Sequence, residues 1–224
     1  GPSGCGKSTL LKMVAGLLAP SDGRLLLWRK PVEQLSETGR KMAFVFQSPT
    51  LMPWASVQTN VRLPLDLAGV PRAEADARVA EALALVGLSK FAGALPRALS
   101  GGMQMRVSIA RGLVVQPDLL LMDEPFGALD EITRHKLDAD LLELWRRKKL
   151  TVIFVTHSIH EAVFLSTRVI MMAARPGRVV ETFRIDEPYP RTAEFMVSPA
   201  FTGYARQLQH SLLQASANTD EVTP

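Results

Sequence analysis

The chain has 224 residues, of which 47% are hydrophobic and 21% are charged, and its formal net charge is +4. This composition is typical of a globular protein, and no apolar run reaches the roughly 20 residues that a membrane-spanning helix needs. The single cysteine, Cys5, excludes an intramolecular disulfide framework and suits the cytosol. Because no aromatic residues are interleaved with the basic clusters, nucleic acid is not an expected partner.

The first nine residues, GPSGCGKST, fit the phosphate-loop pattern G-x-x-x-x-G-K-[ST]. In such a loop, backbone N–H groups converge on phosphate at a helix N-terminus, the lysine reaches the β and γ phosphates, and the serine hydroxyl coordinates Mg²⁺. Cys5 occupies a free position of the pattern and is expected only to fit as a small residue. The predicted nucleotide-binding residues are therefore Gly1, Pro2, Ser3, Gly4, Cys5, Gly6, Lys7, Ser8 and Thr9.

In the first half of the chain, the predicted secondary structure changes from mixed helix and strand to helix alone. A helix is expected over residues 7–17, a short strand over 24–28 and a buried strand over 41–46. From residue 48 to about residue 116, alanine-rich helical segments dominate, so a helical subdomain is expected there.

The stretch PDLLLMDE (117–124) is a continuous apolar run that ends in two carboxylates. Such a run is typical of a central parallel strand that is buried on both faces. Ligands of open α/β sheets bind beyond the carboxyl ends of the strands. Asp123 is thus a candidate Mg²⁺ ligand and Glu124 a candidate to polarise an attacking water, although an acidic pair at a strand end can also be a helix cap.

The second half of the chain predicts further strands and one long helix. The helix is expected over 131–149 with Asp130 as its N-cap, and a buried strand is expected over 150–157. Residues 168–173 and 177–185 are also predicted strands. Strands that alternate with helices indicate an α/β domain with a mainly parallel sheet, into which the helical subdomain is inserted.

The stretch LSGGM (99–103) predicts a second anion-binding helix N-terminus. Ser100 would cap the helix, and Gly101 and Gly102 would allow a ligand to approach the backbone. A Ser-Gly-Gly helix start that holds no ligand is the alternative.

The phosphate loop, Gln47, LSGGM, MDEPFGALD and VTH resemble, in this order, the signature set of ABC-type ATPase subunits over about residues 1–185. The resemblance implies an ABC-type P-loop NTPase fold that hydrolyses ATP with Mg²⁺. It also implies a head-to-tail dimer in which Ser100, Gly101 and Gly102 of one copy close over the nucleotide of the other. Ala128, Leu129 and Asp130 (the Asp130 loop) look like the loop that makes a contact across this dimer, and Asp130 is an implied nucleotide-site residue. By the same resemblance Gln47 senses Mg²⁺ and the attacking water, and His157 contacts the γ-phosphate. The implied catalytic residues are Glu124, His157 and Gln47, and the implied metal ligands are Ser8, Gln47 and Asp123.

The stretches VFQSPTLMPWASVQTNV and THSIHEAVFLSTRVIMMAARPGRV look like the nitrate/sulfonate/taurine-type importer ATPases, a group that also includes relatives for pyrimidine vitamin precursors. The likeness implies a peripheral protein on the cytoplasmic face of the cell membrane. Its implied partners are a second copy or a homologous ATPase subunit, permease subunits and, indirectly, a solute-binding protein. Trp54 would lie where the helical subdomain meets the permease, or would instead pack in the subdomain's own core.

Two other functions remain open at this point: a soluble ABC ATPase of DNA repair or translation, and a truncated, non-catalytic cassette. The expected ATPase domain covers residues 1–210. Within it, residues 1–47 and 117–185 form the catalytic core, 48–116 the helical subdomain and 186–210 a C-terminal extension, and 211–224 form a flexible tail.

Family members carry strands and an adenine-stacking aromatic residue before the phosphate loop, whereas this sequence begins at Gly1. The sequence is therefore expected to be a fragment or a gene model with a wrong start. Without those strands, the strands that end at Asp123 and Thr156 would lack neighbours. We expect such a chain to fold poorly or to bind nucleotide weakly.

Overall fold

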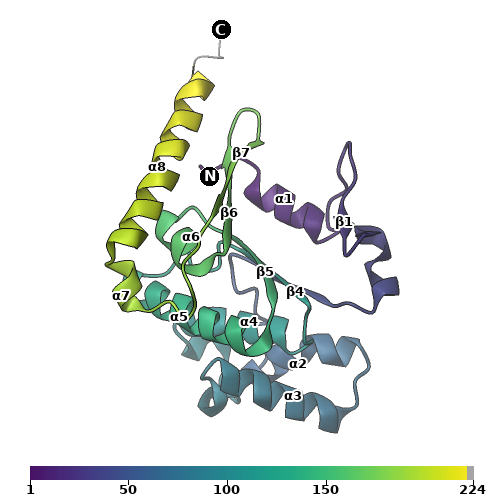
Figure 1. The fold of residues 1–224 in the computed structure, drawn as a ribbon. Helices are drawn as coiled ribbons and strands as arrows, with labels where there is room; N and C mark the ends of the chain where they lie inside the picture. Colours follow the sequence, from purple (N-terminus) through teal and green to yellow (C-terminus); the bar gives the residue numbers. More distant parts are fainter. Residues whose placement is uncertain (221–224) are drawn as a thin grey trace.

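The computed structural model describes residues 1–220, which are arranged around a three-stranded parallel sheet (Figure 1). Its strands are β3 (Met42–Val45), β4 (Leu119–Asp123) and β5 (Thr151–Val155), in the spatial order β3-β4-β5. All five residues of β4 are buried, as its uninterrupted apolar sequence predicts for a central strand. The predicted parallel sheet is thus confirmed, and the three carboxyl ends meet at one edge.

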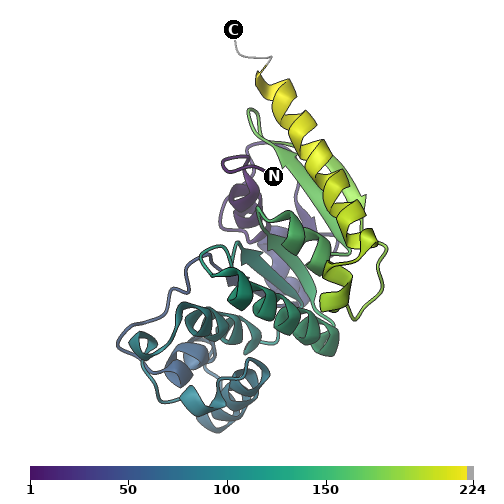
Figure 2. The ribbon, with the colours of Figure 1, turned by 90° about the vertical axis from the view of Figure 1, so that its left-hand side faces the viewer.

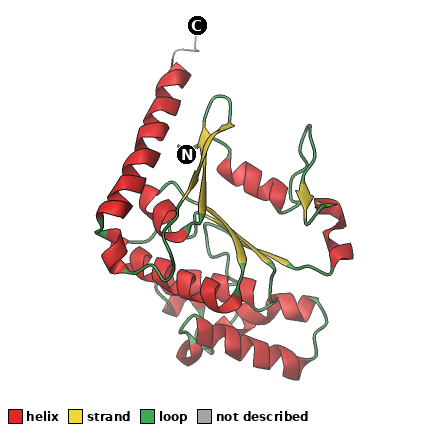
Figure 3. Ribbon diagram, viewed as in Figure 1, coloured by secondary structure: helices red, strands yellow, loops and turns green. Residues whose placement is uncertain are grey.

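Helices cover both faces of this sheet, so that the core has three layers (Figure 3). Successive side chains of a strand point to opposite faces. Leu121 of β4 packs in a cluster with α1 (Lys7–Val14), whereas its neighbour Leu120 packs with α4 (Gly101–Leu113) and α5 (Glu131–Lys148). Consequently α1 and the α4–α5 pair lie on opposite sides of the sheet.

Between β3 and β4 the chain forms a helical lobe, seen at the lower end of Figure 2. The lobe consists of α2 (Val57–Leu67), α3 (Arg72–Leu85) and α4, together with the short turns η2 (Ser89–Phe91) and η3 (Pro96–Ala98). Apolar residues of α2, α3 and α4 form a core separate from that of the sheet. The prediction that residues 48–116 are mainly helical is therefore confirmed.

The C-terminal part packs against α5, through Leu142. The strands β6 (Arg168–Ala173) and β7 (Arg178–Arg184) pair antiparallel in a sheet of their own. This hairpin forms a third core with α6 (Ile159–Leu165), α7 (Ala193–Met196) and α8 (Pro199–Asp220). The prediction of strands here was correct, but they do not extend the parallel sheet.

Near the N-terminus, the chain makes a small hairpin of β1 (Leu26–Leu27) and β2 (Lys30–Pro31), followed by the 3₁₀ segment η1 (Val32–Thr38). The strand predicted over 24–28 is therefore too long. Trp28 has a φ of 50°, in the left-handed region that ends a strand and begins a turn.

Two further expectations need correction. The flexible tail predicted over 211–224 is helical as far as Asp220, because α8 continues without a break, and residues 221–224 lie outside the described part. The strand that ends at Asp123 also does not lack neighbours, since β4 pairs with β3 on one side and β5 on the other. Among the described residues, β3 and β5 are the two edge strands of this sheet, and each has one side without a partner strand.

Candidate functional site

The glycine-rich loop leads directly into α1, as the motif predicts. Gly6 is the N-cap and has a φ of 95°, a conformation that glycine adopts without the steric cost of a Cβ atom. The first N–H groups of an α-helix have no acceptor within the helix, and the helix dipole favours an anion beside them. The loop and the first turn of α1 therefore fit a phosphate group.

The ammonium group of Lys7 lies across the mouth of this loop. Its Nζ donates to the carbonyl oxygens of Gly1 and Pro2, each at 2.9 Å, and lies 3.7 Å from Oε1 of Glu124. The Lys7 side chain is largely buried. A positive charge is thus held at the position where an anion would meet the helix N-terminus.

Ser8 and Asp123 meet between α1 and the end of β4. The Ser8 hydroxyl donates to Oδ1 of Asp123 at 2.8 Å. Asp123 is therefore not a helix cap; the following helix, α5, is capped by Asp130, which accepts from the Thr133 N–H at 2.9 Å. Hydroxyl and carboxylate oxygens are ligands that Mg²⁺ prefers, so this pair fits the predicted metal.

Glu124 and His157 form the second polar pair, at the carboxyl ends of β4 and β5. Nδ1 of His157 lies 3.0 Å from Oε2 of Glu124, and the backbone N–H of Glu124 donates to the Val155 carbonyl at 2.9 Å. The Glu124 carboxylate is only 19% exposed, whereas the imidazole is 56% exposed. A partly buried carboxylate beside an accessible imidazole and an ammonium group can accept a proton and hold a water molecule.

Two groups of predicted residues are not part of this cluster: Gln47, and the helix start at Ser100, Gly101 and Gly102. Gln47 is exposed, two residues beyond β3 at the same edge of the sheet. Ser100 caps α4 by accepting from the Met103 N–H at 3.3 Å, and Gly101 and Gly102 lie against the Asp130 side of α5. Because α4 and α1 cover opposite faces of the sheet, this helix start lies apart from the phosphate loop of the same chain.

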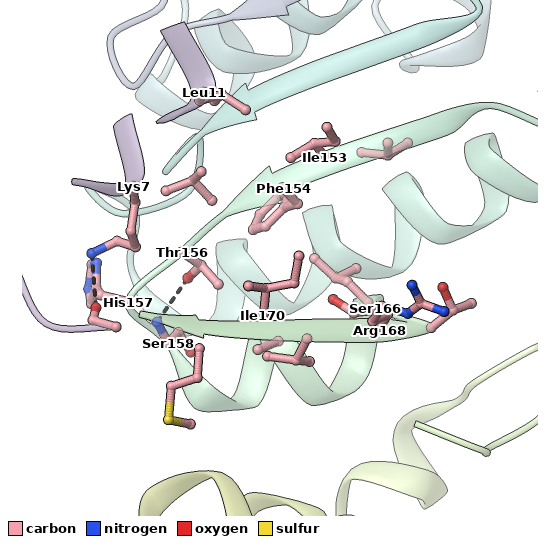
Figure 4. Close-up of a pocket in the computed structure, with 18 of the residues that line it drawn as sticks. Lys7, Leu11, Ile153, Phe154, Thr156, His157, Ser158, Ser166, Arg168 and Ile170 are labelled. Atoms are coloured by element: carbon pink, nitrogen blue, oxygen red, sulfur yellow. Dashed lines mark hydrogen bonds between the residues drawn. The ribbon is translucent and has the colours of Figure 1, made fainter. Parts of the chain in front are cut away.

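A groove of about 620 Å³ runs from this cluster along the free edge of β5, between α1 and β6 (Figure 4). Lys7 and His157 lie at one end of the groove, and Leu11, Ile153 and Ile170 lie along it. Its walls are mainly apolar, with Lys7 at the end beside the cluster and Arg168 at the opposite end.

Trp54 lies on the surface of the molecule. Its side chain is 78% exposed, which excludes the alternative that it packs in the core of the helical lobe. Leu67, at the end of α2, is also highly exposed.

Three charged residues beside the site were not predicted: Arg134, Asp138 and Glu161. Asp138 and Glu161 are buried, and Arg134 contacts the loop that begins at Glu124. The sequence feature that could have indicated Glu161 is its position among the apolar residues of α6, four positions after His157. Nothing in the sequence showed which face of that helix is buried.

In residues 1–220, no helix has the length and apolar character that crossing a membrane requires.

Comparison with known proteins identifies the class of protein. Residues 1–127 match the sequence profile of a family described as "ABC transporter". The chain therefore belongs to the ABC transporter family, whose ATP-binding subunits bind and hydrolyse ATP.

Individual relatives point in the same direction. A protein of Brucella abortus (strain 2308) described as ATP-binding is 46% identical over 221 residues, which cover 99% of this chain and 84% of that protein. The taurine import ATP-binding protein TauB of Rhizobium johnstonii is 51% identical over 211 residues, or 94% of this chain and 76% of that protein. The solved structure of cbiO1 from Clostridium perfringens, part of the ABC transporter complex cbiONQ, has a TM-score of 0.74 and 32% identity, covering 83% of this chain and 75% of that one. The predicted ABC-type fold is thereby confirmed.

Proposed function

We propose that this chain is the ATP-hydrolysing subunit of an importer for a small solute of the nitrate, sulfonate or taurine type. The observation that carries the proposal is the meeting of Lys7, Ser8–Asp123 and Glu124–His157 at the ends of β4 and β5. A lone phosphate loop would support nucleotide binding, but the paired carboxylates and the imidazole also support hydrolysis.

In this proposal each polar group has one task. The loop N–H groups and Lys7 bind the phosphates of ATP, and Ser8, Asp123 and Gln47 hold Mg²⁺. When bound, the metal neutralises charge on the phosphates. Glu124 accepts a proton from the attacking water at its carboxylate, and His157 holds that carboxylate and the water in place.

The site is completed by a second copy or by a homologous ATPase subunit. The helix start at Ser100, Gly101 and Gly102 lies apart from the loop of its own chain, and Ser100 and Gly101 are exposed, which supports its use on the nucleotide of a partner. The Asp130 loop contributes the contact across the dimer. Closure of the dimer and its reopening after hydrolysis then drive transport.

The remaining partners are membrane components. The exposed Trp54 is the proposed contact with a permease, since large exposed aromatic side chains are enriched at protein interfaces. The named taurine importer among the relatives supports a small solute and, indirectly, a solute-binding protein. The protein is accordingly proposed to work at the cytoplasmic face of the cell membrane.

Steady-state ATP hydrolysis of the Glu124→Gln variant tests the proposed chemistry. Glutamine keeps the size of the side chain but cannot take up the proton, so the turnover number should fall at least about 100-fold while ATP binding is retained. Glu131→Gln, an exposed substitution in the first turn of α5, is the matched control and should leave turnover unchanged. Full turnover by Glu124→Gln would contradict the proposal.

A further inference from the structure

Behind the Glu124–His157 pair lies a cluster of three charged side chains that the proposed chemistry does not use. Arg134 and Asp138 come from α5, and Glu161 comes from α6. Asp138 is 1% exposed and Glu161 is 5% exposed. Burying a charged group costs free energy unless the group is paired or neutralised, so each of these side chains needs partners within the protein.

On one side, Glu161 fixes the turn that carries His157. Oε2 of Glu161 accepts a hydrogen bond from the Thr156 hydroxyl, and the Thr156 oxygen in turn accepts from the Ser158 N–H at 2.8 Å, a contact drawn in Figure 4. His157 is the residue between these two. Glu161 therefore anchors the backbone on both sides of the imidazole.

On the other side, Arg134 fixes the loop that begins at Glu124. Its Nη2 donates to the Leu129 carbonyl at 2.8 Å and its Nε to the Phe126 carbonyl at 3.3 Å. The same Nε lies 3.7 Å from Oε1 of Glu161. One guanidinium group thus contacts the loop and the carboxylate that holds the His157 turn.

We propose that Arg134 and Glu161 form a positioning bridge that couples the 126–129 loop to the turn of His157, and so sets the distance between His157 and Glu124. A second copy that contacts this loop would thereby act on His157 through the bridge. The inference rests on the proposed roles of Glu124 and His157. Neither Arg134 nor Glu161 touches the reacting atoms, so both are positioning residues.

Asp138 explains how the buried cluster is neutralised. Its Oδ1 has no hydrogen-bond partner among the described residues. Burial, followed by the nearby charge of Glu161, raises the pKa of Asp138 to about 8, although Arg134 acts in the opposite direction. Burial also raises the pKa of Glu161, but Thr156 and Arg134 favour its charged form. With a pKa of about 8, Asp138 carries a proton at neutral pH, and of the two carboxyl groups it is Glu161 that lies within 3.7 Å of Arg134.

The test combines hydrogen–deuterium exchange with ATP hydrolysis for Glu161→Gln. Glutamine can still accept from Thr156 but loses the ionic contact with Arg134. Amides of residues 126–130 and 156–158 should exchange faster than in the parent, while those of β4 do not. Misplacement of His157 should lower kcat about tenfold, and KM for ATP should stay within about twofold because the phosphate loop is unchanged. Glu143→Gln, an exposed partner of Arg146 and Arg147 on α5, is the matched control.

A second variant, Arg134→Lys, tests the bridge independently in case Glu161→Gln does not fold. Lysine keeps the charge but lacks the planar guanidinium group, in which Nε and Nη2 reach the Phe126 and Leu129 carbonyls separately, so exchange should rise in 126–130 and less in 156–158. Unchanged exchange in both segments and unchanged kcat in both variants would overturn the bridge. Full turnover by Glu124→Gln would instead overturn the proposed chemistry, and the exchange data would still decide the bridge because they do not depend on hydrolysis.

Discussion

At the scale of single residues, Glu124 combines a proposed catalytic task with an unusual backbone. Its φ of 44° lies in the left-handed region, which costs free energy for any residue with a Cβ atom. The bond from its N–H to the Val155 carbonyl and the contact with His157 hold it there. We infer that the strain is kept because it turns the carboxylate from the end of β4 toward Lys7 and His157.

Asp138 gives a pH-dependent prediction. Its pKa is about 8 in the folded chain and about 3.9 when unfolded, so the folded state holds a proton that the unfolded state releases in this interval. The contribution to the free energy of unfolding is fully present below about pH 4 and is lost as the pH rises to about 8. Asp138→Asn should lack this decline, which urea denaturation at a series of pH values would measure.

The neighbouring Asp140 provides the comparison for that experiment. Asp140 is exposed on the same helix and pairs with Arg106 at 2.7 Å. Asp140→Asn should keep the decline of the parent protein. If Asp138→Asn showed the same decline as the parent, Asp138 would not be the group that carries the proton.

At the scale of elements, local signals predicted the parts that local physics determines. The unbroken apolar run of β4, the Asp130 cap of α5 and the glycine loop before α1 each depend on a few neighbouring residues, and all three are present. The antiparallel pairing of β6 with β7 depends on contacts between strands, for which a hydrophobic pattern gives no register.

The same distinction applies to the candidate site. Lys7, Ser8, Asp123, Glu124 and His157 belong to recognisable motifs, and the structure brings them together. The Arg134–Glu161 bridge joins two helices through side chains that belong to no motif. Such contacts depend on how α5 and α6 face each other, which periodicity alone does not give.

Arg191 supplies a prediction at this scale, because it joins α6 to the segment before α7. Its guanidinium group is buried, and Nη1 donates to the carbonyls of Val163, Phe164 and Ser166 at 2.8 to 2.9 Å. Val163 and Phe164 lie in the last turn of α6 and Ser166 is its C-cap, and the carbonyl groups at the end of a helix receive no hydrogen bond from an N–H group of that helix. Arg191→Met should lower the free energy of unfolding by about 3 kcal/mol, since the substitution leaves these groups buried and unpaired.

Urea denaturation at neutral pH would measure the effect of Arg191→Met. The matched control is Arg184→Met, because Arg184 is exposed at the end of β7 and pairs only with the exposed Asp186 among the described residues. The control should change the free energy of unfolding by less than about 0.5 kcal/mol. Equal effects of the two substitutions would show that Arg191 does not stabilise the end of α6.

At the scale of the whole molecule, the two helix starts proposed to bind anions lie in different layers. The phosphate loop opens α1 on one face of the sheet, and Ser100 opens α4 on the other, at the helical lobe. One chain therefore cannot bring both to a single nucleotide without a rearrangement of its layers. Two copies arranged head to tail would bring each loop to the other's Ser100 and complete two equivalent sites.

Static light scattering of the Glu124→Gln variant tests this central claim most directly. At fixed protein concentration, the mass should double when ATP and Mg²⁺ are added, because blocked hydrolysis keeps two nucleotides between two copies. Adding the substitution Ser100→Arg should prevent the doubling while each chain still binds ATP, since a bulky side chain at the start of α4 would block the partner's phosphates. A Glu124→Gln protein that binds ATP and stays monomeric would contradict the shared site.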